Sequence, residues 1–516
     1  MTNITFYGGV GEIGGNKIIL TSKEQSLMLD WGLSFGGEGK YFEEFLQPRT
    51  NSVLQDYLRL GLTPNLDGIY RKDLLKCPAP EEFSQGQQKH LWCTDIKSYD
   101  EYAENKNPFI DGILISHAHI DHCGYLGLLD PKIPTYFSQT TDTILDTMDR
   151  MGMQGILGEM YNPSDIILTQ LKSGYTPGAL RLKKEPVQRN TNPKDKPFEI
   201  KDFHVVPHPV DHSLLGATAF EIHTPDDLTV VYTGDLRFHG RQAEKTKRFV
   251  KKVSKKEVDV LITEGTRIED KEKDSEKEVY EETLTLVEQA KSAVFVGFAW
   301  KDITRYQTIK QIAEKTGKTF VISAKTAFLL HQLDGYNNPE EESHVKVYLP
   351  RSKSMLYSMG DYTSNKYDAG YLADWSEQQD FTHIENGVRA HDIAKDPEQY
   401  IVFLDYFHIK ELLDIGPVPN SIYVRAQSEP FNEEMKLSEE RLINWLTKFK
   451  INEDNDNEPY QVHASGHASG SELIQMINDI QPKTVIPVHT EQPERFQKML
   501  EGVKVTLPEY GEDIRF

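Results

Sequence analysis

Short apolar runs, separated by polar and glycine-rich segments, characterise the first half of the chain. Within Ile4–Tyr7, Lys17–Thr21 and Ser26–Leu29, apolar and polar positions alternate, which predicts three strands with short connections. Runs of similar length predict further strands at Phe109–Ser116, Phe203–Val206, Ala217–His223 and Leu228–Thr233.

The pattern changes near residue 241. Lys245–Lys256 predicts a helix and Val258–Thr263 a strand, and Ser275 with Glu278 forms a capping box for a helix that reaches about Lys291. Strands and helices then alternate, which predicts an α/β unit with a mostly parallel sheet. The segments concerned are Ala293–Phe298, Thr304–Lys315, Thr319–Ser323, Ala327–Leu333, Tyr400–Leu404, Ser421–Val424 and Ser438–Phe449.

Two stretches near the start do not follow this pattern. Residues 31–110 have no sustained period, and we interpret them as an irregular insertion. Residues 9–14 satisfy G-x-G-x-x-G, the dinucleotide-binding pattern, which requires a helix to begin at the loop. Because Asn16–Leu20 contains β-branched residues and continues as a strand, the sequence argues against a dinucleotide site.

Composition indicates a globular protein. The 516 residues, of which 38% are hydrophobic and 27% charged, suffice for two or three domains. No apolar run approaches the roughly 18 residues of a membrane span, and no basic leader precedes the first strand. The three cysteines, Cys77, Cys93 and Cys123, form no disulfide pattern, so we expect a cytoplasmic protein without membrane contact.

The net charge of −22 argues against a generic nucleic-acid binder, since such proteins neutralise phosphates with lysine and arginine. It does not exclude a local basic groove, because salt screens surface fields beyond about 8–10 Å. One basic cluster stands out, and we interpret it as a solvated helix face, with RNA contact as the alternative. It comprises Lys245, Lys247, Arg248, Lys251, Lys252, Lys255 and Lys256.

The strongest chemical signal is the segment His117-Ala118-His119-Ile120-Asp121-His122. Four ligand-type side chains follow an apolar strand directly, and burying them without partners would cost several kcal/mol. Alternation places His117 and His119 on one side as ligands of one metal, whereas Asp121 and His122 can face a second ion. We expect Cys123 to be a small buried residue beside this site.

Three further ligand-type residues follow the same design, in which an apolar strand ends at a potential ligand. His212 follows the run at Val205–Val210, Asp235 follows Val230–Gly234, and His489 follows Thr484–Val488. The repetition indicates that one metal site is assembled from several strand ends.

The order His117-x-His119-x-Asp121-His122, His212, Asp235 resembles that of metallo-β-lactamase fold hydrolases. Leu261–Thr266, the run His463–Ser469 and Pro487-Val488-His489 resemble motifs A, B and C of the β-CASP nucleases within that group. Gly8–Gly14 and the two C-terminal motifs are similar to the ribonuclease J family. As a set these matches are specific, although each one alone is weak.

The resemblance implies two zinc ions, with manganese as an alternative metal. His117, His119 and His212 would hold one ion. Asp121, His122 and His489 would hold the other, with Asp235 bridging. Asp30 matches an aspartate that braces the ligand loop from behind.

The resemblance also assigns the remaining candidate residues. Catalysis would involve Asp121, Asp235, Glu264 and His467. Glu264 would orient a ligand histidine or assist proton transfer, and His467 would contact the scissile phosphate or protonate the leaving oxygen. Phosphate contacts would come from His463, Ser465, Gly466, His467 and Ser469.

The implied fold class is α/β: an αββα metallo-β-lactamase sandwich with an inserted α/β β-CASP domain. The expected domains are 1–264 (with the insertion at about 31–110), 265–458, and a completing segment at 459–516. Two departures from the family matter. In the first, Phe298-Ala299-Trp300-Lys301-Asp302 replaces a Ser-Asn-type pair near the family's pocket for a 5′ phosphate. In the second, only residues 490–516 follow His489, so we expect the family's extra C-terminal domain to be missing, and with it the usual argument for an oligomer.

These features predict zinc-dependent hydrolysis of phosphodiester bonds in single-stranded RNA, as an endonuclease or 5′-exonuclease, with a metal-bridging hydroxide as nucleophile. The motif C histidine, His489, resembles the RNA-directed branch of the family. The alternatives are a DNA-directed enzyme, a small-molecule phosphodiesterase on the same metal scaffold, and a non-catalytic subunit. The last is disfavoured because all seven ligand-type residues are present.

Overall fold

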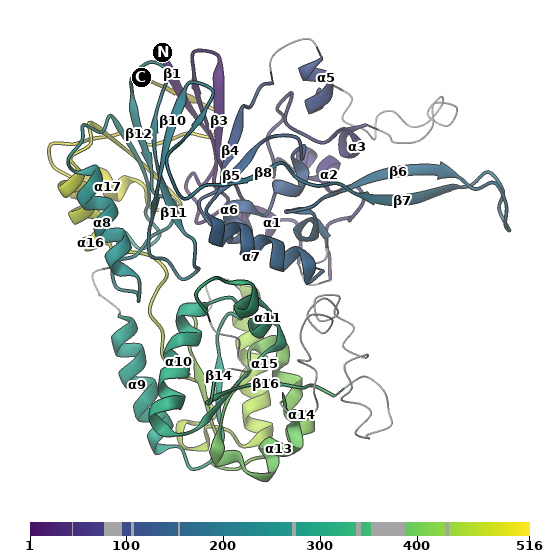
Figure 1. Cartoon of the computed structure of the whole chain (residues 1–516), viewed down its shortest axis with the longest axis vertical. Coiled ribbons are helices and arrows are strands. Elements are labelled where there is room, and N and C mark those ends of the chain that lie inside the picture. Colours follow the sequence, from purple (N-terminus) through teal and green to yellow (C-terminus); the bar gives the residue numbers. More distant parts are fainter. Residues whose placement is uncertain are drawn as a thin grey trace.

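Two seven-stranded sheets packed face to face form the larger part of the molecule, and a third seven-stranded sheet forms a separate lobe beneath them (Figure 1). This computed structural model describes residues 1–43, 45–76, 95–104, 108–152, 155–270, 275–336, 342–351, 387–428 and 433–516. Cys77 and Cys93 lie outside these residues. Within them, no helix is long and apolar enough to cross a membrane.

The first sheet contains the predicted N-terminal strands and the strand that precedes the histidine segment. Its order is β23-β1-β2-β3-β4-β5-β8, antiparallel from β23 to β3 and parallel from β3 to β8. The bounds are β1 Thr2–Gly8, β2 Lys17–Ser22, β3 Gln25–Trp31, β4 Gly112–Leu114, β5 Thr135–Phe137, β8 Thr191–Pro193 and β23 Asp513–Arg515. The glycine loop leads into β2, a strand, so the argument against a dinucleotide helix is confirmed.

The second sheet joins segments from both ends of the chain. Its order is β22-β21-β13-β12-β11-β10-β9. The bounds are β9 Phe198–Ile200, β10 Phe203–Pro209, β11 Thr218–His223, β12 Thr229–Tyr232, β13 Val260–Glu264, β21 Thr484–Val488 and β22 Lys504–Val505. Because β13 and β21 pair in parallel with Glu264 opposite Val488, the ends of these two strands meet.

Apolar side chains fill three layers of this sandwich. The inner faces of the two sheets meet in one core, with Leu29 and Leu114 from the first sheet against Phe220 and Ile262 from the second. Helices cover both outer faces: α8 (Ala243–Val253), α16 (Gly470–Ile480) and α17 (Glu494–Met499) cover the second sheet, and α7 (Gln139–Arg150) lies on the side of the first (Figure 1). The predicted αββα arrangement is therefore confirmed.

The lobe is an α/β unit whose sheet is parallel throughout, as the alternating pattern predicted. Its order is β17-β16-β15-β18-β14-β19-β20. The strands are β14 Val294–Gly297, β15 Thr319–Ile322, β16 Val345–Tyr348, β17 Gly387–Val388, β18 Tyr400–Phe403, β19 Ile422–Arg425 and β20 Tyr460–Gln461. The helices are α9 Glu276–Gln289, α10 Ile303–Thr316, α11 Ala324–Gln332, α13 Ala390–Lys395, α14 Leu412–Ile415 and α15 Glu433–Phe449. Ser275 caps α9 as predicted, accepting a hydrogen bond from the Glu278 amide. The domain boundaries stay a prediction.

Residues 31–110 are less irregular than the sequence indicated. They contain α1 (Phe35–Glu38), α2 (Val53–Leu60), α3 (Lys72–Leu75) and α5 (Tyr99–Ala103). Val53, Leu54 and Tyr57 of α2 are buried in the core on the outer face of the first sheet. The prediction missed α2 because the helix has only 8 residues, so its apolar face repeats over about two turns.

One other local prediction is corrected. The strand expected at Phe109–Ser116 is shorter and spans only β4, Gly112–Leu114. The structure also contains a hairpin that no pattern predicted, β6 (Ser164–Gln170) with β7 (Leu180–Pro186), which projects from the sandwich (Figure 1). Its β7 strand is mostly exposed, so it lacks the buried alternate face that marks a strand in sequence.

Candidate metal centre

All seven residues predicted as ligands lie together at one edge of the sandwich, where strands from both sheets end. His117 and His119 follow β4, and Asp121 and His122 lie in the short helix α6 (Ile120–Cys123). His212, Asp235 and His489 follow β10, β12 and β21. Carboxyl ends of neighbouring parallel strands meet at one sheet edge, which explains how sites so far apart in sequence converge.

The ligand-type atoms form two groups that match the predicted division. Those of His117, His119 and His212 lie within 4.8 Å of one another, as do those of Asp121, His122, Asp235 and His489. In the first group, Nδ1 of His119 lies 2.9 Å from Nε2 of His117 and 3.0 Å from Nε2 of His212. In the second, Nε2 of His489 lies 3.2 Å from Oδ2 of Asp121.

Asp235 lies between the two groups. Its Oδ2 atom is 3.0 Å from Nε2 of His122 and 3.6 Å from Nε2 of His489 in the second group. The same oxygen is 3.8 Å from Nε2 of His117 and 3.9 Å from Nε2 of His212 in the first. Its other oxygen, Oδ1, is buried and has no hydrogen-bond partner among the described residues. A buried carboxylate with one oxygen among several imidazoles and the other oxygen without a partner fits a site for cations.

The protonation states also fit metal binding. Burial lowers the pKa of His117 and His212 well below the usual value, and neighbouring histidines lower it further. The pKa of His119 falls to about 3, through burial and then the charge of Lys301. These three imidazoles are therefore neutral at pH 7, which is the form that binds metal. Burial alone would raise the pKa of Asp235, but His122, His489 and His467 hold it well below the usual value.

Asp30 braces this centre from behind, at the position where the sequence placed it. It is fully buried at the end of β3, and its φ of 58° lies in the left-handed region. Its carboxylate accepts hydrogen bonds from Ser116 N (2.7 Å), Ser116 Oγ (2.8 Å) and Tyr232 OH (2.5 Å). Nδ1 of His122 lies 2.7 Å from the same carboxylate, so the histidine's other ring nitrogen points to Asp235.

Other ligand histidines are oriented in the same way, by partners that the sequence did not reveal. The Thr266 hydroxyl lies 2.8 Å from Nδ1 of His489, and the carbonyl oxygen of Gly466 accepts a hydrogen bond of 2.6 Å from Nδ1 of His212. A Cβ at Gly466 would lie 2.8 Å from Oγ of Ser213, so glycine permits this close approach. Partners of this kind fix the tautomer and direction of a ligand ring.

Glu264 contacts His467, which lies beside both groups. Oε2 of Glu264 lies 2.9 Å from Nδ1 of His467, and Oε1 accepts a hydrogen bond of 3.0 Å from the Leu236 amide. Burial would lower the pKa of His467, but Glu264 and then Asp235 raise it to about 9. At neutral pH His467 is therefore an imidazolium, whose side chain is 20% exposed.

The other residues of the predicted phosphate loop have mixed surroundings. Ser465 presents its carbonyl to Arg237 and His239, and its hydroxyl accepts a hydrogen bond of 3.1 Å from the His467 amide. Ser469 is fully buried and caps α16. Burial and four surrounding arginines, Arg305 first, lower the pKa of His463 to about 3. The phosphate contacts of these residues stay a prediction.

Sequence reasoning also missed Lys301, whose side chain reaches the centre from the lobe. Its Nζ donates to the Ala118 carbonyl, between His117 and His119, at 3.3 Å. The altered segment Ala299–Asp302 was the available signal. Cys123 is fully buried, as predicted, and its thiol contacts the His119 carbonyl at 3.1 Å.

Comparisons with known proteins agree with this geometry. Residues 100–300 match the model of the Beta-lactamase superfamily domain, and residues 459–508 match that of the Zn-dependent metallo-hydrolase RNA specificity domain. The second match contains His463–Ser469 and His489.

Several similar proteins are named Ribonuclease J. The one from Mycoplasma pneumoniae is 21% identical over 99% of this chain and 70% of its own length. The one from Thermus thermophilus is 24% identical over 94% of this chain and 67% of its own length, and the one from Helicobacter pylori 26695 is 21% identical over 98% and 58%.

A crystal structure of a protein of unknown function from Enterococcus faecalis V583 shares the fold. Its TM-score is 0.66 at 22% identity, covering 99% of both chains. The resemblance drawn from the motifs is thus confirmed: the chain matches the models of a Beta-lactamase superfamily domain and of a Zn-dependent metallo-hydrolase RNA specificity domain, and over most of its length it is similar to proteins named Ribonuclease J.

Proposed function

We propose that this protein is a metal-dependent hydrolase that cleaves phosphodiester bonds in RNA. The observation that carries the proposal is the contact between two matched regions. His467 and His489, from the region that matches an RNA specificity domain, lie against Asp235 and Asp121, from the region that matches a Beta-lactamase superfamily domain. A site for cations and a site for a phosphate would therefore lie at the same edge of the sandwich.

The residues present fit two zinc ions. His117, His119 and His212 would hold one, and Asp121, His122 and His489 the other, with Asp235 between them. Imidazole and carboxylate ligands without thiolate suit zinc, and they also accept manganese. Bound ions would act as Lewis acids toward the phosphodiester and the attacking water.

The chain's own groups would orient and neutralise the substrate. The charge of Glu264 keeps His467 protonated and holds its Nδ1, so the opposite ring nitrogen, Nε2, can donate to a phosphate oxygen. A hydrogen bond between charged partners is about twice as strong as a neutral one. His467 can also give its proton to the leaving oxygen, after which Glu264 stabilises the imidazole in one tautomer.

RNA is the preferred substrate because the relatives named Ribonuclease J align over most of the chain, and because the second match is named for RNA specificity. The lobe beside the site favours a polymer over a small molecule. We further propose that this RNA is single-stranded.

The test uses purified, zinc-loaded protein with four substrates: 5′-monophosphorylated RNA, 5′-hydroxyl RNA, circular RNA and single-stranded DNA of the same sequence. Cleavage of circles establishes endonuclease action, and preference for the monophosphate establishes a 5′-end-dependent exonuclease. Asp121→Ala and His467→Ala should abolish cleavage or reduce it at least a hundredfold. Metal analysis should give about two zinc ions per chain.

Two results would contradict the proposal. If the zinc-loaded protein cleaves none of these nucleic acids but hydrolyses bis(p-nitrophenyl) phosphate, the small-molecule alternative holds. If cleavage survives in Asp121→Ala, it comes from a contaminating nuclease.

A further inference from the structure

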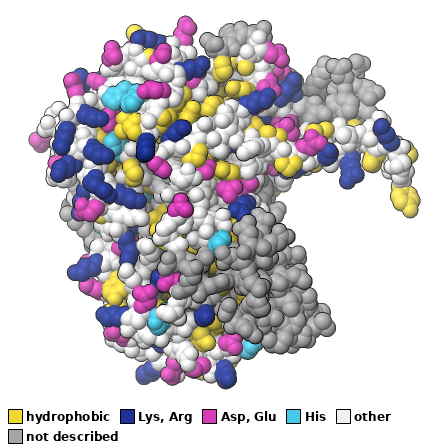
Figure 2. Space-filling model, in the orientation of Figure 1, with side chains coloured by type: hydrophobic (Ala, Val, Ile, Leu, Met, Phe, Trp, Pro, Cys, Tyr) yellow, Lys and Arg dark blue, Asp and Glu magenta, His cyan; other side chains and the backbone are white. Residues whose placement is uncertain are grey.

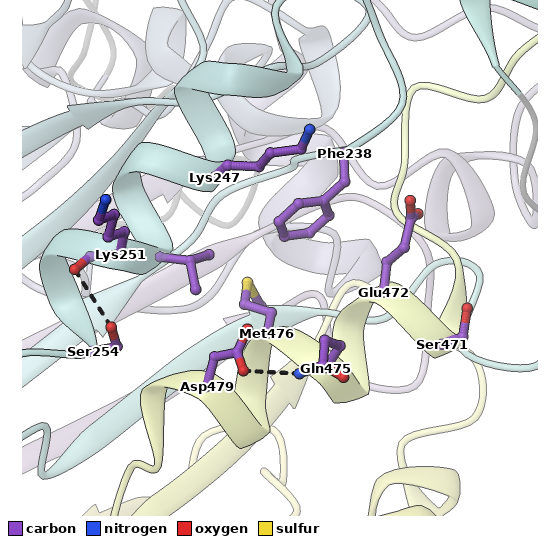
Figure 3. Close-up of a pocket in the computed structure, with 10 residues that line it drawn as sticks. Phe238, Lys247, Lys251, Ser254, Ser471, Glu472, Gln475, Met476 and Asp479 are labelled. Carbon is purple, nitrogen blue, oxygen red and sulfur yellow. Dashed lines mark hydrogen bonds between the residues drawn. The ribbon is translucent and has the colours of Figure 1, made fainter.

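A groove of about 640 Å³ lies between α8 and α16 on the outer face of the second sheet (Figure 3). Lys247 and Lys251 line one side, from successive turns of α8. Gln475 and Asp479 line the other side, from α16. Phe238 and Met476 contribute apolar surface between the two helices.

The groove begins beside the candidate metal centre. Phe238 belongs to the segment that leaves Asp235, and Ser471 to the first turn of α16, just after the loop that carries His467. His239 joins the two segments, because one ring nitrogen lies 3.0 Å from the Ser465 carbonyl oxygen and the other 3.3 Å from Glu472. From there the groove follows both helices away from the centre, to Ser254 at the end of α8.

The α8 side is basic on a chain whose net charge is −22. Lysine and arginine side chains gather over the part of the surface where α8 and α16 lie (Figure 2). Among the residues that the structure describes, Lys247 pairs only with Glu244 on its own helix, an exposed contact worth little. Among the described residues, Lys251 has no ion pair at all. Both ammonium groups are therefore available to anions.

The α16 side has the opposite character. Asp479 accepts a hydrogen bond of 2.8 Å from Gln475, and both present polar groups of the kind that pair with base edges. The carboxylate of Glu472 already accepts a hydrogen bond of 2.9 Å from the Ser469 amide and contacts His239. These partners offset its negative charge. Phe238 is partly buried, and the part of its ring that lines the groove can stack on an unstacked base.

A single RNA strand has the same division, with phosphates along one side and bases along the other. We propose that this groove binds the RNA chain beyond the scissile phosphate, with phosphates along the α8 lysines and bases toward Phe238 and α16. The inference rests on the proposed function, which it extends by a second RNA contact outside the metal centre.

The test compares two charge-reversed variants of equal net charge, both in or just after α8. Lys247→Glu/Lys251→Glu changes the groove, whereas the matched control Lys252→Glu/Lys255→Glu changes exposed lysines that do not line it. Each zinc-loaded full-length protein is assayed on a tetranucleotide and on a 20-nucleotide RNA at several salt concentrations.

For the groove variant, we expect KM for the 20-nucleotide RNA to rise about tenfold, with kcat and the tetranucleotide kinetics unchanged. The salt dependence should weaken, its slope falling by about 1.4 for two lost phosphate contacts on a single strand. The control should change KM less than twofold.

The outcomes separate the inference from the proposed function. Equal effects of the two variants would identify a general charge effect, and an unchanged KM would exclude RNA from the groove; either result overturns the inference while RNA cleavage by the wild type stands. A wild-type protein that neither binds nor cleaves either RNA would overturn both.

Discussion

Nζ of Lys301 lies 3.3 Å from the carbonyl oxygen of Ala118, so a lysine of the lobe contacts the backbone between two candidate metal ligands. Lys301 forms no ion pair with a carboxylate among the residues that the structure describes, and burial lowers its pKa. A partly buried ammonium without a counter-ion is costly unless an anion joins it. The phosphate of the substrate is the anion that this site would supply.

Lys301→Met should therefore lower kcat/KM for RNA at least tenfold without changing the zinc content or the melting temperature. Lys301→Arg keeps the positive charge, so its kcat/KM should fall less. Kinetics and metal analysis of the three proteins check this, and equal losses in both variants would instead indicate a packing role against Met148.

Replacing Glu264 should affect catalysis more than metal binding. Glu264→Gln removes the charge that holds Nδ1 of His467 and keeps its imidazole protonated. We expect kcat to fall about a hundredfold, as for His467→Ala, because general acid catalysis contributes about 10²–10⁴-fold. The kcat of the double variant Glu264→Gln/His467→Ala should be no lower than that of either single variant. Additive losses of kcat would show that the two residues act separately.

Asp30 should set metal affinity from behind the site. Asp30→Asn tolerates the left-handed backbone at this position but removes the charge that contacts His122. We expect zinc affinity, measured by chelator competition, to fall about 10–100-fold. Tyr232→Phe removes only one donor to Asp30 and serves as the milder control. Wild-type affinity in Asp30→Asn would contradict the bracing role.

Metal removal should destabilise the fold around the centre. Dialysis against a chelator should abolish RNA cleavage and lower the melting temperature, and zinc should restore both. Free metal at a hundred times its Kd stabilises the native state by about 2.7 kcal/mol. His117→Ala, which lacks one ligand, should show a smaller shift on chelation, and an equal shift would place the stabilising ion elsewhere.

Glu221 should make stability depend on pH far from the metal centre. It is fully buried between His208, at 2.9 Å, and Lys256, at 2.5 Å. Burial alone would raise its pKa, but these partners lower it to about 2. Since the folded pKa is below the unfolded one, the stabilisation is present above about pH 4.3 and is lost as pH falls toward 2.

Glu221→Gln should therefore cost about 2–3 kcal/mol at pH 7, and the difference should shrink below pH 4. Melting curves from pH 7 to pH 3 measure this difference in stability between the wild type and Glu221→Gln, with the exposed Glu199→Gln as the control. A difference that stays constant with pH would mean that the lost stability comes from packing instead of charge.

The sequence by itself determined many of the strands, the parallel lobe and the identity of the ligand-type residues. These signals are local: a strand needs only a few alternating residues, and a ligand at a strand end is visible within the same run, as with Asp235 after β12. The motif order then supplied the family, and with it the αββα arrangement.

Only the tertiary structure decided which side chains meet. Glu264 lies next to His467 because the loop before α16 is held against the segments that follow β12 and β13. The Ala468 amide donates to the Leu236 carbonyl, and Ser469 forms a β-bridge with Arg267. No local pattern encodes these contacts. Lys301 reaches Ala118 because the lobe packs against the sandwich. The short helix α2 is stabilised by burial of its apolar face on the first sheet. Contacts between distant segments depend on packing of the whole chain, which is why the ligand set was readable from the sequence and its surroundings were not.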